Sequence, residues 1–393
     1  MPHFWLVATH MPPNPSTAGI RAASFARYAA RNGWTGDVLT LDHGDERPAD
    51  FDKQFLGVSI HRASAKAALH WRIDGLLDGG IADLRALTGA AGMAERMPDL
   101  VVATGPPFNT FLAGQHLARR HQVPLALDYR DEWTLNPFEF VARRPFDRSL
   151  ERRALKAARL VIFTTEAMRR HAVQTFGEGL ESKSVVIANG WEAGDFAHDP
   201  SISERPEPAP GLRKRLLFLG TLSDMLDPRP FLAALADAHA ADPGLAEKLV
   251  VRFTGRKTPT MQAALDAFPV PALVEDAAPV PRAAIAGELA SAHAALLFAD
   301  ERVARYRPTK LYEYVRSGLP IVIWGANGEA GAVVRTLNQG LVTRAVDTVL
   351  KMMADPPQPD SAARARFLDG HRRDRLAASF FAQLDQLLSA SSR

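Results

Sequence analysis

The chain has 393 residues, 47% of them hydrophobic and 23% charged, a composition typical of a globular protein with about two domains. The formal net charge of +3, from 47 basic and 44 acidic side chains, is too balanced for a basic surface that binds nucleic acid. The absence of cysteine excludes disulfides, thiolate metal sites and cysteine nucleophiles. No stretch reaches the roughly 20 apolar residues that a membrane span needs, so we expect a cytoplasmic protein.

Short apolar runs alternate with helix-length segments through the first half of the chain. This pattern predicts a parallel sheet wrapped by helices, and it defines a first Rossmann-like α/β domain over residues 1–196. Each apolar run is continuous, as strands buried on both faces require. The predicted strands lie at residues 4–8, 38–41, 100–103, 125–127, 160–163 and 185–187.

Prolines and polar residues then interrupt the alternation and predict a linker over residues 197–212. The alternation restarts in a second predicted Rossmann-like domain over residues 213–365, which is followed by a C-terminal segment, 366–393. An apolar stripe over residues 362–388 predicts one closing helix that begins at the end of this domain and runs through most of the segment. Ligands of such sheets bind beyond the carboxyl ends of the strands, so we expect the site in a cleft between the domains. The predicted strands of the second domain lie at residues 216–219, 249–253, 294–298 and 321–323.

Two segments of the first domain carry polar residues directly after predicted strands. The loop over residues 12–21 runs into the first helix, with Ser16 or Thr17 as its N-cap. Further along, Asp131 follows the strand at 125–127, where a carboxylate would orient or deprotonate a ligand hydroxyl. A structural ion pair between Arg130 and a neighbouring carboxylate is the alternative.

Basic residues dominate residues 143–159, where Asp147 and Glu151 are the only acidic side chains among seven arginines and lysines. A solvated helical face is one explanation of this run. Contact with the anionic lipids of a membrane is the other.

The most informative segment is Arg307-Pro-Thr-Lys-Leu-Tyr-Glu-Tyr-Val-Arg-Ser-Gly-Leu-Pro-Ile-Val322. Pro308 predicts the start of a helix whose exposed amides attract an anion, and Lys310 adds a full positive charge there, which suits a diphosphate. Glu313 lies on nearly the same face and would accept hydrogen bonds from paired hydroxyls of a ribose. A surface ion pair between Lys310 and Glu313 is the alternative.

This segment resembles the donor-binding helix of retaining family-4 GT-B glycosyltransferases. Segments 98–107, 123–133, 185–196 and 218–222 also resemble the family, in its order, so the similarity covers nearly the whole chain. It implies the GT-B fold, with two Rossmann-like doubly wound domains facing across a cleft and a C-terminal helix that crosses back to the first. It also implies a nucleoside-diphosphate-sugar donor and an acceptor hydroxyl of a saccharide, a lipid-linked saccharide or a small molecule.

The resemblance also implies roles for individual residues. Catalysis would involve Asp131, Lys310 and Glu313. The acceptor and the cleft would be contacted by Ser16, Thr17, Arg130, Asp131, Trp133 and Glu166. The donor would be bound by Gly19, Arg21, Gly220, Thr221, Arg229, Arg256, Lys257, Pro308, Thr309, Lys310, Leu311 and Glu313.

Two positions depart from the family pattern. Arg305 replaces the first acid of the Glu-x7-Glu motif that ends at Glu313, and Thr221 stands where the family has an arginine. Arg229 or the Arg256-Lys257 pair would supply the missing charge.

These departures keep alternatives open: a non-catalytic GT-B-like partner or sugar-binding protein, or a nucleotide-sugar epimerase or phosphorylase of the same fold. A nicotinamide dehydrogenase is disfavoured because no Gly-x-Gly-x-x-Gly follows a strand. The histidines lack metal-ligand spacing, and we expect neither a metal nor another cofactor. We expect no nucleic-acid partner, and we expect a cytoplasmic enzyme that contacts the inner face of a membrane through residues 143–159.

Overall fold

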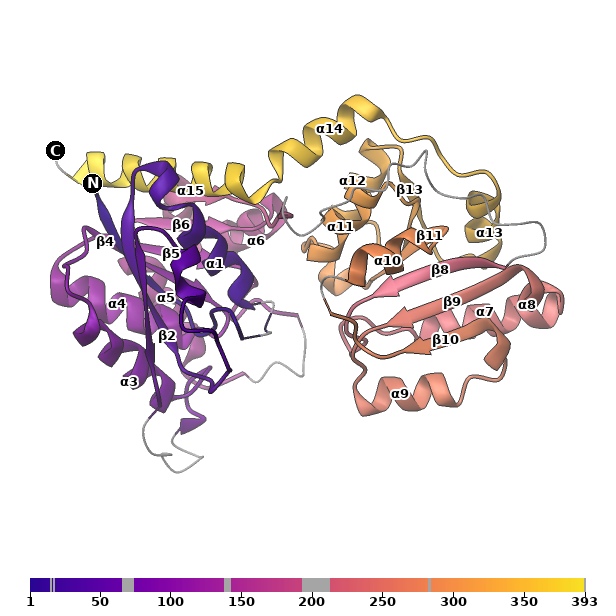
Figure 1. Cartoon of the computed structure of the whole chain (residues 1–393), viewed down its shortest axis with the longest axis horizontal. Helices are drawn as coiled ribbons and strands as arrows, with labels where there is room; N and C mark the ends of the chain where they lie inside the picture. Colours follow the sequence, from indigo (N-terminus) through magenta and orange to yellow (C-terminus); the bar gives the residue numbers. More distant parts are fainter. Residues whose placement is uncertain are drawn as a thin grey trace. The chain divides into compact units, whose positions relative to one another are not determined.

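The computed structural model describes residues 1–14, 16, 18–65, 74–137, 143–192, 213–281 and 284–391. The chain folds into two compact units (Figure 1). Unit 1 comprises Met1–Asn189 and Arg373–Arg393, and unit 2 comprises Gly190–Arg372. The predicted linker, 197–212, lies outside the described residues.

The described part of unit 1 contains a seven-stranded parallel sheet. Its order places β1 beside β4, so the chain winds outward in both directions from this point. The four central strands, β1, β4, β5 and β6, are buried along their whole length, which explains their continuous apolar sequences. In spatial order the strands are β3 (Val58–Ala63), β2 (Thr35–Leu41), β1 (His3–Val7), β4 (Leu100–Gly105), β5 (Leu125–Tyr129), β6 (Leu160–Phe163) and β7 (Ser184–Val186).

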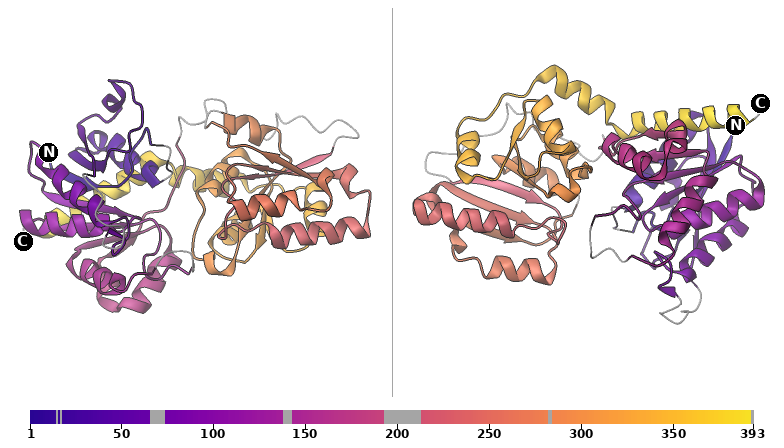
Figure 2. Two further views of the ribbon diagram at one scale, coloured as in Figure 1. Left: turned by 90° about the horizontal axis from the view of Figure 1, so that it is seen from below. Right: turned by 180° about the vertical axis from the view of Figure 1, so that it is seen from behind.

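Helices cover both faces of this sheet. The C-terminal helix α15 packs beside α1. Figure 2 shows α15, in yellow, lying along unit 1. The rings of Phe25 and Phe380 stack with their centroids 3.9 Å apart, and both belong to a core cluster that includes Phe4 of β1. The helices of unit 1 are α1 (Ala18–Tyr28), α3 (Ile81–Ala90), α4 (Asn109–His121), α5 (Asp147–Ala157), α6 (Glu166–Phe176) and α15 (Arg373–Ser391).

The described part of unit 2 contains a six-stranded parallel sheet, with β8 beside β11 at its switch point. Two hydrophobic clusters, one centred on Phe218 and Phe253 and the other on Tyr314 and Ile323, include alternate residues of the same strands. The sheet is therefore covered on both faces. Its strands in spatial order are β10 (Val274–Ala277), β9 (Leu249–Thr254), β8 (Lys214–Leu219), β11 (Ala294–Ala299), β12 (Ile321–Gly325) and β13 (Gly340–Thr343).

The helices of unit 2 follow its strands along the chain. They are α7 (Arg229–Ala241), α8 (Leu245–Lys248), α9 (Pro259–Asp266), α10 (Ile285–Ala290), α11 (Thr309–Ser317), α12 (Glu329–Thr336), α13 (Val346–Ala354) and α14 (Ser361–Gly370). None of the helices among the described residues of either unit is long and apolar enough to cross a membrane.

The structure differs from the sequence prediction at the end of the chain. Residues 362–388 were predicted as one helix, but they are divided between α14 and α15. The break at His371 and Arg372 coincides with the return of the chain to unit 1. There the main chain of Trp191 pairs with the segment at His371 and Arg372, which cannot continue a helical hydrogen-bond ladder.

Candidate functional site

Each sheet has a topological switch point, between β1 and β4 in unit 1 and between β8 and β11 in unit 2. In doubly wound sheets ligands bind beyond the carboxyl ends of the strands that flank this point. The residues that follow these strands are therefore the candidate site residues of each unit.

In unit 2 the N-terminus of α11 has no side-chain cap. The helix begins at Thr309, and Pro308 at its N-cap provides no side-chain hydrogen bond. The first amides of a helix lack intrahelical partners and attract anions. The N-terminus of α11 therefore has no side-chain cap that an anion would have to displace.

Two charged side chains of α11 lie together at this end of the helix. The Lys310 ammonium is 2.9 Å from Glu313 Oε2, so the ion pair expected from their spacing is present. Lys310 keeps 27% of its side chain exposed, whereas Glu313 keeps 9%. The lysine can therefore reach a ligand from its present position.

A glycine turn after β8 lies next to this helix. The backbone N–H of Leu219 donates to the Tyr314 hydroxyl of α11 over 2.8 Å, which ties the helix to the end of the strand. Burial raises the pKa of Tyr314, so the hydroxyl is neutral. Gly220 has φ +151°, and a side chain on the adjacent Gly255 would come within 1.8 Å of the Gly220 oxygen. Only glycines fit this close approach of two backbones.

The next helix, α12, already has its own anion. The Glu329 carboxylate lies in its first turn and accepts from the Arg307 guanidinium at 2.8 Å. Arg307 immediately precedes Pro308, so this ion pair also fixes the entry to α11. We call Gly220, Gly255, Pro308, Lys310 and Glu313 the unit 2 cluster.

In unit 1 the end of β5 is held by a buried ion pair. Asp128 is fully buried and Arg21 of α1 is 9% exposed. Nε and an Nη of Arg21 donate to Asp128 at 2.9–3.0 Å, and its remaining donors reach the main-chain oxygens of Ile187 and Ala188 at 2.8 Å. Arg21 was expected to bind the donor, but its hydrogen bonds are used inside unit 1.

Arg130 likewise serves the backbone of unit 1. Its guanidinium donates to the main-chain oxygens of Gly105, Pro106 and Ala18. Burial lowers the pKa of Arg130, with the nearby carboxylates opposing this effect. Arg130 thus joins the start of α1 to the end of β4. Among the described residues its guanidinium makes no hydrogen bond to Asp131.

Asp131 follows Arg130 and remains partly exposed. Its partial burial raises its pKa, Arg130 opposes the rise and Glu132 adds to it. Both neighbours make hydrogen bonds elsewhere: Arg130 donates to main-chain oxygens, and Glu132 is hydrogen-bonded to the His171 ring at 2.7 Å. The Asp131 carboxylate makes no hydrogen bond to the described residues, so it can accept one from a ligand.

His10 was not predicted as a site residue, although it lies only three residues beyond the end of β1. Its ring stacks on His43 with the centroids 4.7 Å apart. Burial lowers the pKa of His10, with His43 and Arg130 contributing, so the imidazole is neutral near pH 7. A side chain at Gly19 would meet the His10 carbonyl oxygen at 2.9 Å, which explains the glycine in the first turn of α1. We call His10, Gly19, Arg130 and Asp131 the unit 1 cluster.

Three further residues expected at the donor site differ in availability. The Lys257 side chain is 7% exposed, donates to two carbonyl oxygens and pairs with Asp276, so it caps strands instead of reaching a ligand. Arg229 pairs with Asp227 at 2.7 Å. Arg256 is exposed, and the described residues contain no ion pair with it. The backbone oxygen of Arg256 accepts from Leu222, two residues after Gly220.

The remaining expected residues occupy mixed positions. Ser16 Oγ accepts from the amide of Ala18, the first residue of α1, at 3.2 Å. Trp133 is buried and stacks on Phe108. Glu166, at the start of α6, pairs with Arg169 at 3.0 Å. Thr221 is exposed beside Gly220, Leu311 is buried in the core, and Thr17 lies outside the described residues.

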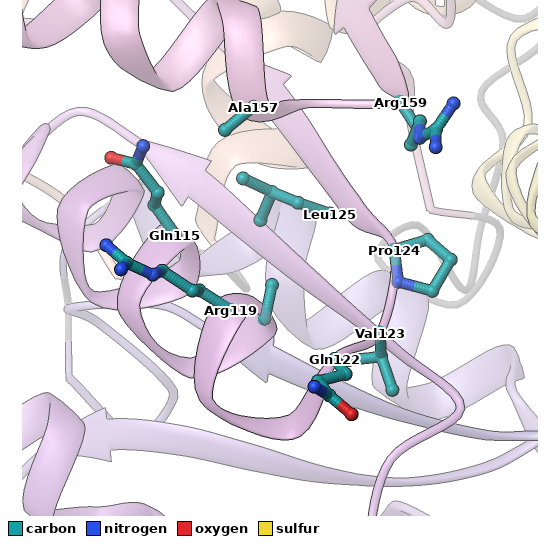
Figure 3. A pocket seen from close by; sticks show the side chains of 9 residues that line it. Gln115, Arg119, Gln122, Val123, Pro124, Leu125, Ala157 and Arg159 are labelled. Atoms are coloured by element: carbon teal, nitrogen blue, oxygen red, sulfur yellow. The ribbon is translucent and has the colours of Figure 1, made fainter.

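A groove of about 430 Å³ opens at the opposite edge of unit 1 (Figure 3). Arg119 and Arg159 flank it, and Pro124 and Leu125 lie where β5 begins. The groove contains no residue of the unit 1 cluster. Within the described ranges, no group of three or more side chains is arranged to hold a metal ion.

Comparisons with known proteins agree with this architecture. Residues 16–190 match the family described as the glycosyl transferase 4-like domain. A comparison with curated protein sequences finds no match.

Solved structures resemble the whole chain. The sucrose-phosphate synthase of Thermosynechococcus elongatus is 16% identical, with a TM-score of 0.73 over 100% of both chains. Anabaena HepE, in complex with UDP and glucose, is 14% identical, with a TM-score of 0.66 over 98% of this chain and 100% of its own. A glycosyltransferase from Rickettsia africae is 10% identical, with a TM-score of 0.67 over 98% of both chains.

At these identities the structural likeness establishes the fold, which is the GT-B fold expected from the sequence. The sequence match covers the greater part of unit 1. The chain therefore has the GT-B fold, and its residues 16–190, in unit 1, are similar to the glycosyl transferase 4-like domain.

Proposed function

We propose that this protein is a retaining glycosyltransferase that moves a sugar from a nucleoside-diphosphate sugar to an acceptor hydroxyl. The acceptor is a saccharide, a lipid-linked saccharide or a small molecule. In this reaction the bond from the anomeric carbon to the diphosphate breaks, and a bond to the acceptor oxygen forms on the same face of the sugar. The acceptor proton passes to the leaving diphosphate.

The N-terminus of α11, which has no side-chain cap and has Lys310 beside it, is the main support for donor binding. Negative charge grows on the diphosphate as it leaves, and fixed amides with a lysine stabilise that charge most where it develops. Arg256, exposed beside the Gly220 turn, is the cation best placed to replace the arginine missing at Thr221. The structures of HepE and of an E. coli protein bound with UDP-2-fluoro glucose support a nucleotide sugar as the ligand of this fold.

The acceptor half of the proposal rests on the unit 1 cluster. The Asp131 carboxylate makes no hydrogen bond to the described residues. Its raised pKa brings it closer to the range of a general base. We assign Asp131 to the acceptor hydroxyl, which it orients by accepting a hydrogen bond. Glu313 accepts from hydroxyls of the donor ribose.

A donor screen followed by product analysis tests this function. UDP, GDP and dTDP sugars are added to the protein during thermal unfolding, and the correct donor raises the melting temperature, since a ligand at 100 times its Kd stabilises by about 2.7 kcal/mol. The anomeric configuration of the transferred or hydrolysed sugar is then read by NMR. Inversion contradicts the retaining mechanism, and binding without transfer or hydrolysis favours the non-catalytic alternative.

The proposal assigns no step to a metal or another cofactor. Lys310 and the α11 amides stabilise the charge of the leaving diphosphate. Adding EDTA to the transfer assay should therefore leave the rate unchanged, and a rate restored only by a divalent cation would contradict this part of the proposal.

We also propose that unit 1 contacts an anionic membrane through α5, at the inner face for a cytoplasmic enzyme. The two acids of this helix, Asp147 and Glu151, are buried, so they do not offset the exposed charges. Arg152, Arg153 and Lys156 are exposed, and the described residues hold no ion pair with them. Such a surface suits a lipid-linked acceptor.

Replacing Arg152, Arg153 and Lys156 with alanine should weaken binding to phosphatidylserine vesicles by about 100-fold, because each basic residue near the surface contributes about 1 kcal/mol. Cosedimentation measures the effect. Arg47, Lys53 and Arg85, also exposed on unit 1, provide a control variant with the same loss of charge. Equal binding by the two variants would contradict a specific role for α5.

A further inference from the structure

Glu151 is a buried carboxylate on the inner side of α5. It is 2% exposed and lies beside Leu155, Phe163 and Phe176 around a small cavity. A carboxylate in apolar surroundings is costly unless it accepts hydrogen bonds. Its partners therefore indicate what it holds in place.

Within the described residues, the Glu151 carboxylate accepts its hydrogen bonds from residues 129–134. The Tyr129 hydroxyl donates to Oε1 at 3.3 Å. The Thr134 amide donates to Oε2 at 3.2 Å, and the Thr134 hydroxyl donates to the same oxygen. Arg148, on the preceding turn of α5, also donates to Thr134 Oγ1 at 3.0 Å. One carboxylate thus joins the end of β5 to the loop that follows it.

The residues between these two anchors are also fixed, apart from Asp131. Arg130 is bound to main-chain oxygens, Glu132 to His171, and Trp133 lies flat on Phe108 with their centroids 5.0 Å apart. The Asp131 side chain makes no hydrogen bond to the described residues. The backbone of Asp131 is therefore held on both sides while its carboxylate stays available.

The environment of Glu151 favours a mixed charge state near neutrality. Burial raises the pKa of Glu151 to about 7, and hydrogen bonds from Thr134, the charge of Arg148 and the Tyr129 hydroxyl act against that rise. Glu132 also lines the cavity, where its charge is met by His171 of α6. Burial and Glu151 together raise the pKa of Tyr129, which stays a neutral donor.

We propose that Glu151 is a positioning residue that sets the placement of Asp131 toward the acceptor hydroxyl through its hydrogen bonds to Tyr129 and Thr134. This inference rests on the proposed role of Asp131 in sugar transfer. A loss of Glu151 or of the Thr134 hydroxyl then lowers kcat without changing how the donor binds.

The test compares Glu151→Gln, Thr134→Val and Thr134→Ser with the unaltered protein. Glutamine keeps the shape of the side chain but faces the Thr134 amide with a weaker acceptor, and valine removes only the hydroxyl. We expect kcat to fall about tenfold in Glu151→Gln and Thr134→Val, with an unchanged KM for the donor, and to recover in Thr134→Ser, which keeps the hydroxyl. Folded variants with unaltered kcat would overturn the proposal.

Amide hydrogen exchange separates this proposal from the proposed function. Exchange at residues 130–136 should rise in Glu151→Gln and Thr134→Val relative to Thr134→Ser, whether or not the protein transfers sugar. Raised exchange in a protein without transferase activity would mean that the proposed function fails while the anchoring stands. Unchanged exchange would mean that Glu151 does not position this segment.

Discussion

Replacing Lys310 with alanine should weaken nucleotide-sugar binding by about 10- to 100-fold. A hydrogen bond to a charged group contributes about 1.5–3 kcal/mol, and 1.4 kcal/mol corresponds to a factor of ten. The loss in kcat should be at least as large if the diphosphate gains charge during the reaction. Calorimetric titration of the donor and steady-state kinetics measure the two effects.

Two further variants make the result specific. Lys310→Arg keeps the charge and should retain more affinity than alanine. Lys351 lies exposed on α13 of the same unit, and Lys351→Ala removes a charge away from the α11 N-terminus. If Lys310→Ala and Lys351→Ala bound the donor equally well, Lys310 would not contact the diphosphate.

Asp128→Ala should lower the free energy of unfolding by about 3–5 kcal/mol, because it leaves the buried Arg21 guanidinium without its partner. Arg21 also donates to the main chain at residues 187 and 188, so the loss loosens the end of β7 as well as β5. Chemical denaturation followed by circular dichroism measures the change.

Lys248→Ala provides the matched control for this variant. It breaks an ion pair with Asp242 in which both side chains are more than half exposed, and such pairs are screened by water. Its denaturation midpoint should stay at the value of the unaltered protein. A similar stability of Asp128→Ala and Lys248→Ala would show that the Arg21–Asp128 pair does not hold unit 1 together.

The pH dependence of stability offers a further check on Glu151. Its folded-state pKa of about 7 lies above the ordinary value of 4.5, so folding favours the protonated form. The stability from this group is fully present below about pH 4.5 and is lost as the pH rises through about 7. The free energy of unfolding of Glu151→Gln, measured relative to that of the unaltered protein, should therefore rise as the pH is raised from 5 to 8. A difference between the two denaturation midpoints that stays constant over this range would contradict the shifted pKa.

The sequence predicted the buried strands well but missed three of the four edge strands of the described sheets. Central strands such as β4 and β12 must be apolar along their length, which makes them visible as continuous runs. The strands β3, β10 and β13 lie at sheet edges and contain exposed or half-buried residues, so their sequences carry no such run. The fold class was confirmed because the central strands determine it.

Contacts among the candidate site residues were predicted best where the residues are neighbours in the chain. Lys310 and Glu313 share one helix, so their spacing was enough to predict that they meet. Arg21 and Asp128 lie 107 positions apart, and no local pattern shows that a cation will be used inside the protein. The same reason hid the role of Glu151, which looked like a minor offset in a basic run but binds a segment of another element.

A crystal structure of the protein with the nucleotide sugar that best stabilises it would show where the donor binds. We expect phosphate oxygens within hydrogen-bonding distance of Lys310 Nζ and of the first amides of α11, with Glu313 at hydroxyls of the ligand. A nucleotide sugar bound elsewhere on unit 2 or on unit 1, with the α11 N-terminus free of the diphosphate, would contradict this expectation.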